Sequence, residues 1–114
     1  MKDAREPSAL AAELASLLGC DRAVLEAYVS MLQREGPVPP GDIDAAGGVL
    51  ERMKDYGLVI RSGQGYLPVH PRLGISNLYR IGVAKDQAVK GGRVRIDAIT
   101  AYFVRMREDS TEQL

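Results

Sequence analysis

The chain has 114 residues, of which 46% are hydrophobic and 26% charged, and its 15 basic and 15 acidic side chains cancel to a formal net charge of zero. This length and composition predict one folded, soluble domain, and no apolar run is long enough to span a bilayer. Cys20 is the only cysteine and His70 the only histidine, which excludes an intramolecular disulfide and offers no Cys/His cluster for zinc. We therefore expect a cytoplasmic protein without metal, cofactor, membrane contact or enzymatic activity.

Charge is distributed unevenly along the chain. Residues 1–50 carry four basic and eight acidic side chains, whereas residues 61–107 carry nine basic side chains and only two acidic ones. The zero total does not indicate a strongly basic nucleic-acid binder. The charge is nevertheless polarised along the chain.

Two helices are predicted in the first third of the chain. Pro7 and Ser8 form a start signal and Gly19 a stop, while Asp21 stands where the N-cap of a second helix belongs and Gly36 with Pro37 ends it. Apolar residues recur at helical spacing in both segments: Leu10, Leu14, Leu17 and Leu18 in the first, and Val24, Leu25, Tyr28 and Leu32 in the second.

A Pro-rich stretch, GPVPPGD, separates these helices from a third. Its prolines lack amide donors, so we expect a turn there and no helix running through it. The third helix is predicted to begin near Asp42 or Asp44 and to end at Gly57. It places four apolar residues on one face: Ile43, Ala46, Leu50 and Met53.

A β-hairpin is predicted next. Residues 58–61 and 66–69 have strand composition, and SGQG between them suits a hairpin loop. After Pro71 the pattern becomes helical, with Gly91 and Gly92 marking a kink or a break. Four later residues follow the 3-4-3 spacing of a seam between paired helices: Ile96, Ile99, Phe103 and Met106.

This order of elements is that of a winged helix-turn-helix, mainly α with a two-stranded hairpin and a long C-terminal helix. The segment GLVIRSGQGYLPVHPRLGISNLYR, residues 57–80, resembles the wing and following linker of archaeal TrmB-like transcriptional regulators, with YLPVHPR and SNLYR its most distinctive parts. The resemblance implies a DNA-binding winged helix, often dimeric through a helix after the wing. One departure is that residues 40–56 are too few for two full helices and their turn, so we expect a shortened helix-turn-helix with a vestigial first helix.

The predicted contacts with double-stranded DNA come from the third helix and the wing. Arg52 and Lys54 are the only promising base-reading or phosphate-binding residues on that helix. The wing offers a mixture of charged and hydrogen-bonding groups. The candidate DNA-binding residues are Arg52, Lys54, Arg61, Ser62, Gln64 and Arg72.

The seam predicts a homodimer, and with it a division into a winged-helix domain (1–75), a helical dimerisation segment (76–107) and a flexible tail (108–114). A second hypothesis is a degenerate winged helix that serves as a protein–protein interaction or dimerisation module without reading DNA. The basic residues of the last helical region favour a solvated helix face. His70 is interpreted as a structural corner residue, and Cys20 as a buried inert thiol rather than an activated one.

Overall fold

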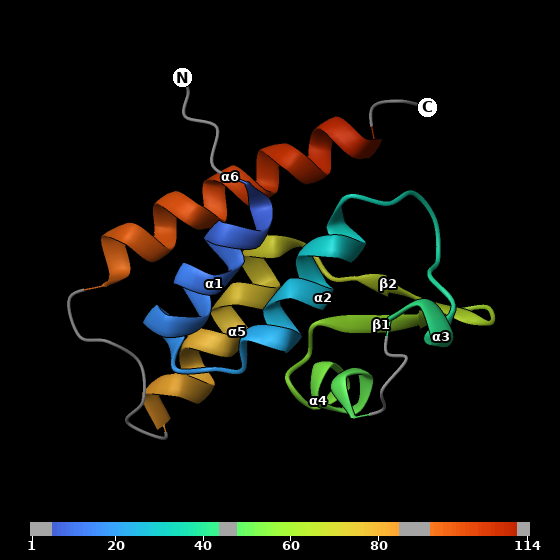
Figure 1. Ribbon diagram of the computed structural model, residues 1–114, viewed down its shortest axis with the longest axis horizontal. Helices are drawn as coiled ribbons and strands as arrows, with labels where there is room; N and C mark the ends of the chain where they lie inside the picture. The colour runs from blue at the N-terminus through green and yellow to red at the C-terminus, as the bar shows by residue number, and fades with distance from the viewer. Residues whose placement is uncertain (1–5, 44–47, 85–91, 112–114) are drawn as a thin grey trace.

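The computed structural model describes residues 6–43, 48–84 and 92–111, and these form helices and one β-hairpin (Figure 1). In chain order the elements are α1 (Pro7–Leu18), α2 (Arg22–Leu32), α3 (Pro40–Ile43), α4 (Val49–Asp55), β1 (Val59–Ser62), β2 (Gly65–Pro68), α5 (Pro71–Ala84) and α6 (Arg93–Thr111). Helices α1, α2 and α5 pack together, α6 crosses them on one side, and the hairpin projects away from this helical body. The predicted mainly helical fold with a hairpin and a long C-terminal helix is confirmed, and its element order is winged-helix-like.

The ends of α1 and α2 follow from local chemistry. Gly19 adopts a left-handed conformation (φ 71°) after α1, and the amide of Cys20 closes the turn by donating to the Ala15 carbonyl at 3.0 Å. The Asp21 carboxylate accepts a hydrogen bond from the Ala23 amide at 2.9 Å and so caps α2. Helix α2 ends at Leu32, four residues before the predicted Gly36 stop.

The expected single third helix is two short helices. Helix α3 begins at Pro40, so no helix runs through the whole Pro-rich stretch, but its last three residues are helical and not part of the predicted turn. Proline is well tolerated at the first position of a helix because that amide needs no partner. Its length of four residues agrees with a vestigial first helix. Helix α4 starts after Gly48 (φ 100°) and buries Met53. Asp44 and Ala46 lie outside the described residues.

The hairpin is joined to the chain that precedes α3. Strands β1 and β2 are antiparallel, with Val59 opposite Pro68 and Ser62 opposite Gly65. Strand β1 lies one residue later in the chain than predicted, and β2 one residue earlier. Val38 bridges to Tyr66 on the far edge of β2 through two backbone hydrogen bonds of 2.8 and 2.9 Å. A Cβ atom at Gly65 would lie 2.8 Å from the Val38 carbonyl oxygen, so glycine permits this approach. The segment after α2 is thereby paired with the outer edge of β2 through a single-residue bridge.

Helices α5 and α6 belong to the same core as the winged helix. Helix α5 spans the predicted boundary after residue 75, and the inner face of α6 packs on α1 and α2, so the division into a winged-helix domain and a separate dimerisation segment is wrong. The Arg95 guanidinium on α6 donates two hydrogen bonds, of 2.5 and 2.8 Å, to the Glu13 carboxylate on α1. Helix α6 also runs to Thr111, so the tail predicted from residue 108 is helical for its first part. Gly92 immediately precedes α6, and Gly91 lies outside the described residues.

A buried tyrosine fixes the wing to the helical body. Tyr28 on α2 is fully buried, and its hydroxyl donates to the backbone carbonyl of Val69 at 2.6 Å. Gly74 on α5 lies against the same hydroxyl, because a Cβ atom there would be 2.7 Å from it. The end of β2 and the start of α5 are therefore both positioned by one side chain of α2.

Candidate nucleic-acid interface

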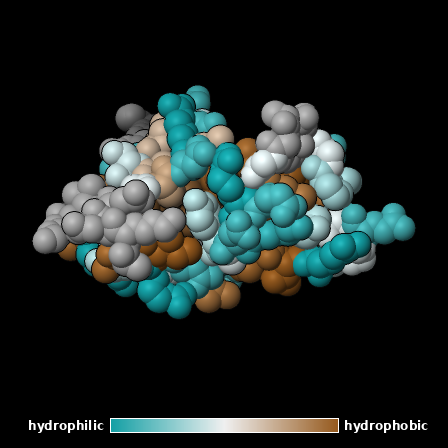
Figure 2. All heavy atoms as spheres, turned by 90° about the horizontal axis from the view of Figure 1, so that it is seen from below, coloured by the Kyte–Doolittle hydropathy of each residue, from teal (hydrophilic) through white to brown (hydrophobic). Residues whose placement is uncertain are grey.

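The tip of the wing carries three of the predicted contact residues. Arg61 and Gln64 are exposed and Ser62 is half-buried, and the loop turns at Gly63 (φ 60°). The Arg61 Nε atom donates to the Gly63 carbonyl at 3.4 Å, a long contact within the same loop. The wing tip is the hydrophilic projection at the right of the molecule in Figure 2. Its groups are accessible to a large partner.

Arg52 is 42% exposed, but its guanidinium is paired with another helix. Its Nη2 atom lies 3.0 Å from a carboxylate oxygen of Asp21, the residue that caps α2. Its Nε atom is buried and has no hydrogen-bond partner within the described part of the chain. Arg52 therefore links α4 to the start of α2.

Lys54 points toward the wing. Its ammonium group lies 3.0 Å from Glu51 and 5.8 Å from the centre of the Tyr66 ring. The hydrogen bond to Glu51 raises the pKa of Lys54 above its ordinary value. Tyr66 is the cross-strand partner of Arg61, and such partners share one face of an antiparallel pair. Lys54 of α4 therefore lies over the ring of the residue that pairs with Arg61 in the wing.

Sequence reasoning missed Tyr66 and Asp21 as parts of this surface. Tyr66 looks like an ordinary strand residue, and its pattern does not reveal that α4 would place a cation over its ring. The sequence predicts Asp21 correctly as a helix cap, but it does not predict the ion pair of Asp21 with Arg52, which lies 31 positions later in the chain. No local signal in the sequence announces such a contact.

Arg72 lies at the corner where the wing joins α5. The Nδ1 atom of His70 accepts a hydrogen bond from the Arg72 amide at 3.2 Å, and the His70 carbonyl accepts from the amides of Leu73 and Gly74. His70 therefore has the structural role expected of it, that of closing the first turn of α5. The Arg72 side chain is exposed and lies beside residues of α6. It does not belong to the wing-tip loop that carries Ser62 and Gln64.

The four residues of the predicted dimer seam face inward. Ile96, Ile99 and Phe103 are at most 2% exposed, and Met106 is partly buried against the same core. The 3-4-3 spacing marks the face by which α6 packs on its own chain. Ile96, Ile99 and Phe103 are therefore not available to a second copy of the chain folded in this way, which contradicts their assignment as dimerisation residues.

The described residues contain no group of three or more His, Cys, Asp or Glu side chains placed to hold a metal ion. Burial, with a smaller effect of the neighbouring Asp21 carboxylate, raises the pKa of the Cys20 thiol to about 12. This thiol is protonated at neutral pH and a poor nucleophile. Among the described helices, none is long and apolar enough to cross a membrane.

Comparison with protein-family models, with curated proteins and with solved structures finds no match to this chain.

Proposed function

We propose that the protein is a winged-helix transcription regulator that binds double-stranded DNA mainly through contacts between its wing and the phosphate backbone. The observation that carries this proposal is the wing itself: Arg61 and Gln64 are exposed near its tip, and Lys54 of α4 lies over the ring of Tyr66, the cross-strand partner of Arg61. Arginine, lysine and small polar side chains are the groups that usually bind DNA phosphates. The resemblance of residues 57–80 to the wing of TrmB-like regulators supports the same function.

Base reading contributes little in this proposal. Helix α4 has seven residues, and its four charged side chains, Glu51, Arg52, Lys54 and Asp55, cancel. Arg52 is bound to Asp21, so using it on a base would break that ion pair. Sequence-specific contacts normally come from such a helix. We therefore expect weak, strongly salt-dependent binding with little preference among DNA sequences.

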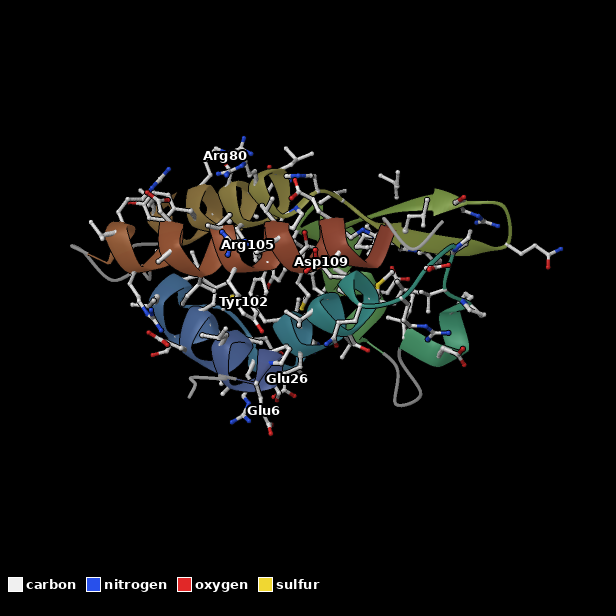
Figure 3. All side chains as sticks on the ribbon, turned by 90° about the horizontal axis from the view of Figure 1, so that it is seen from above. Glu6, Glu26, Arg80, Tyr102, Arg105 and Asp109 are labelled. Carbon is white, nitrogen blue, oxygen red and sulfur yellow. The ribbon has the colours of Figure 1, made fainter. Side chains whose placement is uncertain are left out.

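Fluorescence anisotropy on a labelled duplex of arbitrary sequence, titrated from about 50 to about 300 mM salt, tests this function. The affinity should fall steeply with salt, and Arg61→Gln should lower both the affinity and the salt slope, the latter by about one unit. Arg105→Gln is the matched control, since Arg105 is an exposed arginine of α6 far from the wing (Figure 3). Arg52→Gln should leave the salt slope unchanged because Arg52 is held by Asp21.

A second candidate function, a protein–protein interaction module with a degenerate winged helix, is favoured by one observation. The cations of α4 are already paired, Arg52 with Asp21 and Lys54 with Glu51, which leaves that helix without a free positive charge. This candidate predicts no binding to duplex DNA even at the lowest salt concentration. That result, or an equal loss of affinity in Arg61→Gln and Arg105→Gln, would refute wing-mediated DNA binding.

A further inference from the structure

A small pocket opens between the first halves of α5 and α6, on a part of the molecule that the proposed DNA contacts leave largely unused. Its volume is about 200 Å³, and we call it the α5–α6 pocket. Ile75, Ile96 and Thr100 form its floor and are buried, with exposed fractions of 3%, 2% and 6%. The floor is therefore mainly apolar and belongs to the rigid core.

The floor offers no competing hydrogen-bond donor. The Thr100 hydroxyl donates to the Ile96 carbonyl at 2.7 Å, one turn earlier in the same helix, and so turns its proton away from the pocket. The two isoleucines present only methyl and methylene groups. An apolar portion of a ligand can rest here without leaving a buried polar group unpaired.

Two arginines stand on the rim of the α5–α6 pocket. Arg72 is exposed, and its guanidinium has no ion-pair or hydrogen-bond partner among the residues that the structure describes. Arg93 stacks on the Tyr79 ring, with its guanidinium carbon 4.7 Å from the ring centre. That stacking holds the second guanidinium plane in place beside the opening.

One carboxylate, that of Asp97, shares the rim. It accepts a hydrogen bond from the Arg93 Nε atom at 3.2 Å, and both side chains of this pair are more than half exposed. An exposed pair of this kind contributes little energy, and a guanidinium keeps further N–H donors for another acceptor. The charged lining, Arg72 and Arg93 against Asp97, carries a net charge of +1.

We propose that the α5–α6 pocket binds a small organic carboxylate that has a compact apolar body. The carboxylate pairs with Arg72 and with the free side of Arg93, while the apolar body lies on Ile75 and Ile96. The fork of an arginine matches a carboxylate in geometry as well as charge. A single negative charge balances the lining, and the volume lies below the usual range for drug-sized ligands, which restricts the ligand to a small molecule.

Isothermal titration calorimetry with benzoate as the probe tests the site, with benzamide as its uncharged counterpart of the same shape. Benzoate should bind and benzamide should bind about tenfold more weakly or not at all, because only the anion gains charge-assisted hydrogen bonds. Arg72→Gln should weaken benzoate binding about tenfold. Asp97→Asn should strengthen it, since the repelling carboxylate is removed while the shape of the rim is kept.

Arg105→Gln removes the same charge from an exposed position of α6 that does not line the pocket, and should leave benzoate binding unchanged. Three outcomes would overturn the proposal: no detectable benzoate binding, equal binding of benzoate and benzamide, or equal losses in Arg72→Gln and Arg105→Gln. The last would indicate general attraction of anions to a basic surface. None of these results depends on whether the protein binds DNA.

Discussion

The contact between Tyr28 and Gly74 makes a quantitative prediction about how the wing is fixed to the helical body. Tyr28→Phe removes a buried hydroxyl and leaves the Val69 carbonyl without the 2.6 Å hydrogen bond it accepts. Leaving a buried acceptor unpaired costs about 1–3 kcal/mol. We expect the free energy of unfolding to fall by that amount, with no change in the fold.

Gly74→Ala should destabilise the protein although alanine is the better helix former. Within a helix the exchange gains about 1 kcal/mol, but the new Cβ atom would lie 2.7 Å from the Tyr28 hydroxyl oxygen and 3.1 Å from its Cζ atom. The tyrosine cannot move aside easily, because it is fully buried and its hydroxyl is hydrogen-bonded. Overpacking of this kind costs about 1–3 kcal/mol, so after the helix-propensity gain we expect a net loss of up to about 2 kcal/mol.

The double variant separates this explanation from a general effect of substitutions in the core. In the Tyr28→Phe background the closest contact is absent, so Gly74→Ala should cost less than it does in the wild type, and the two changes should couple by about 1 kcal/mol. Urea unfolding followed by far-UV circular dichroism gives the four free energies, provided that the slope with denaturant is constant. Additive effects, or a stabilising Gly74→Ala in the wild-type background, would refute the steric argument.

Two further predictions concern the core and the cysteine. Phe103→Ala should lower the free energy of unfolding by about 3–5 kcal/mol without changing the oligomeric state, because Phe103 is fully buried in its own chain. Urea unfolding measures the stability, and sedimentation measures the oligomeric state. A shift from dimer to monomer at unchanged stability would contradict this prediction. Cys20 should react with a disulfide reagent at neutral pH far more slowly in the folded than in the unfolded protein, and equal rates would show that the thiol is open to solvent. Since folding raises the pKa of Cys20 from 9.0 to about 12, its contribution to stability should be complete below pH 9 and decline between these values, an effect that Cys20→Ala should remove from the pH profile of unfolding.

The parts of the fold that the sequence predicts correctly are those decided by neighbouring residues. Gly19 and Asp21 act as stop and cap because their backbone conformation and hydrogen bonds involve residues at most a few positions away. The hairpin is equally local, since Ser62 and Gly65 close a short loop. The start of α3 was missed because Pro40 fits both a turn and the first position of a helix, and the sequence alone does not choose between them.

The partners of a helix face are not local, and here the sequence predicted the wrong surface. The spacing of Ile96, Ile99 and Phe103 shows that one side of α6 is buried, but the same pattern arises whether the cover is a second chain or an earlier helix of the same chain. The pairing of Arg95 with Glu13, 82 residues away, belongs to the second case. A dimer of the chain folded in this way would need a surface other than the buried side chains of Ile96, Ile99 and Phe103.

The double use of Asp21 explains why α4 is better suited to positioning the wing than to reading bases. The same carboxylate caps α2 and forms an ion pair with Arg52, so the one arginine of α4 links that helix to the start of α2. Moving Arg52 to a base would cost this ion pair, whereas Arg61 and the wing tip can reach phosphates without breaking any ion pair of the described structure. If the protein binds DNA as proposed, we expect it to discriminate poorly between sequences and to respond strongly to salt, since the binding energy would come from backbone charge. If Asp21→Asn freed Arg52 and sharpened sequence preference at the expense of stability, the ion pair would be identified as the feature that limits base reading.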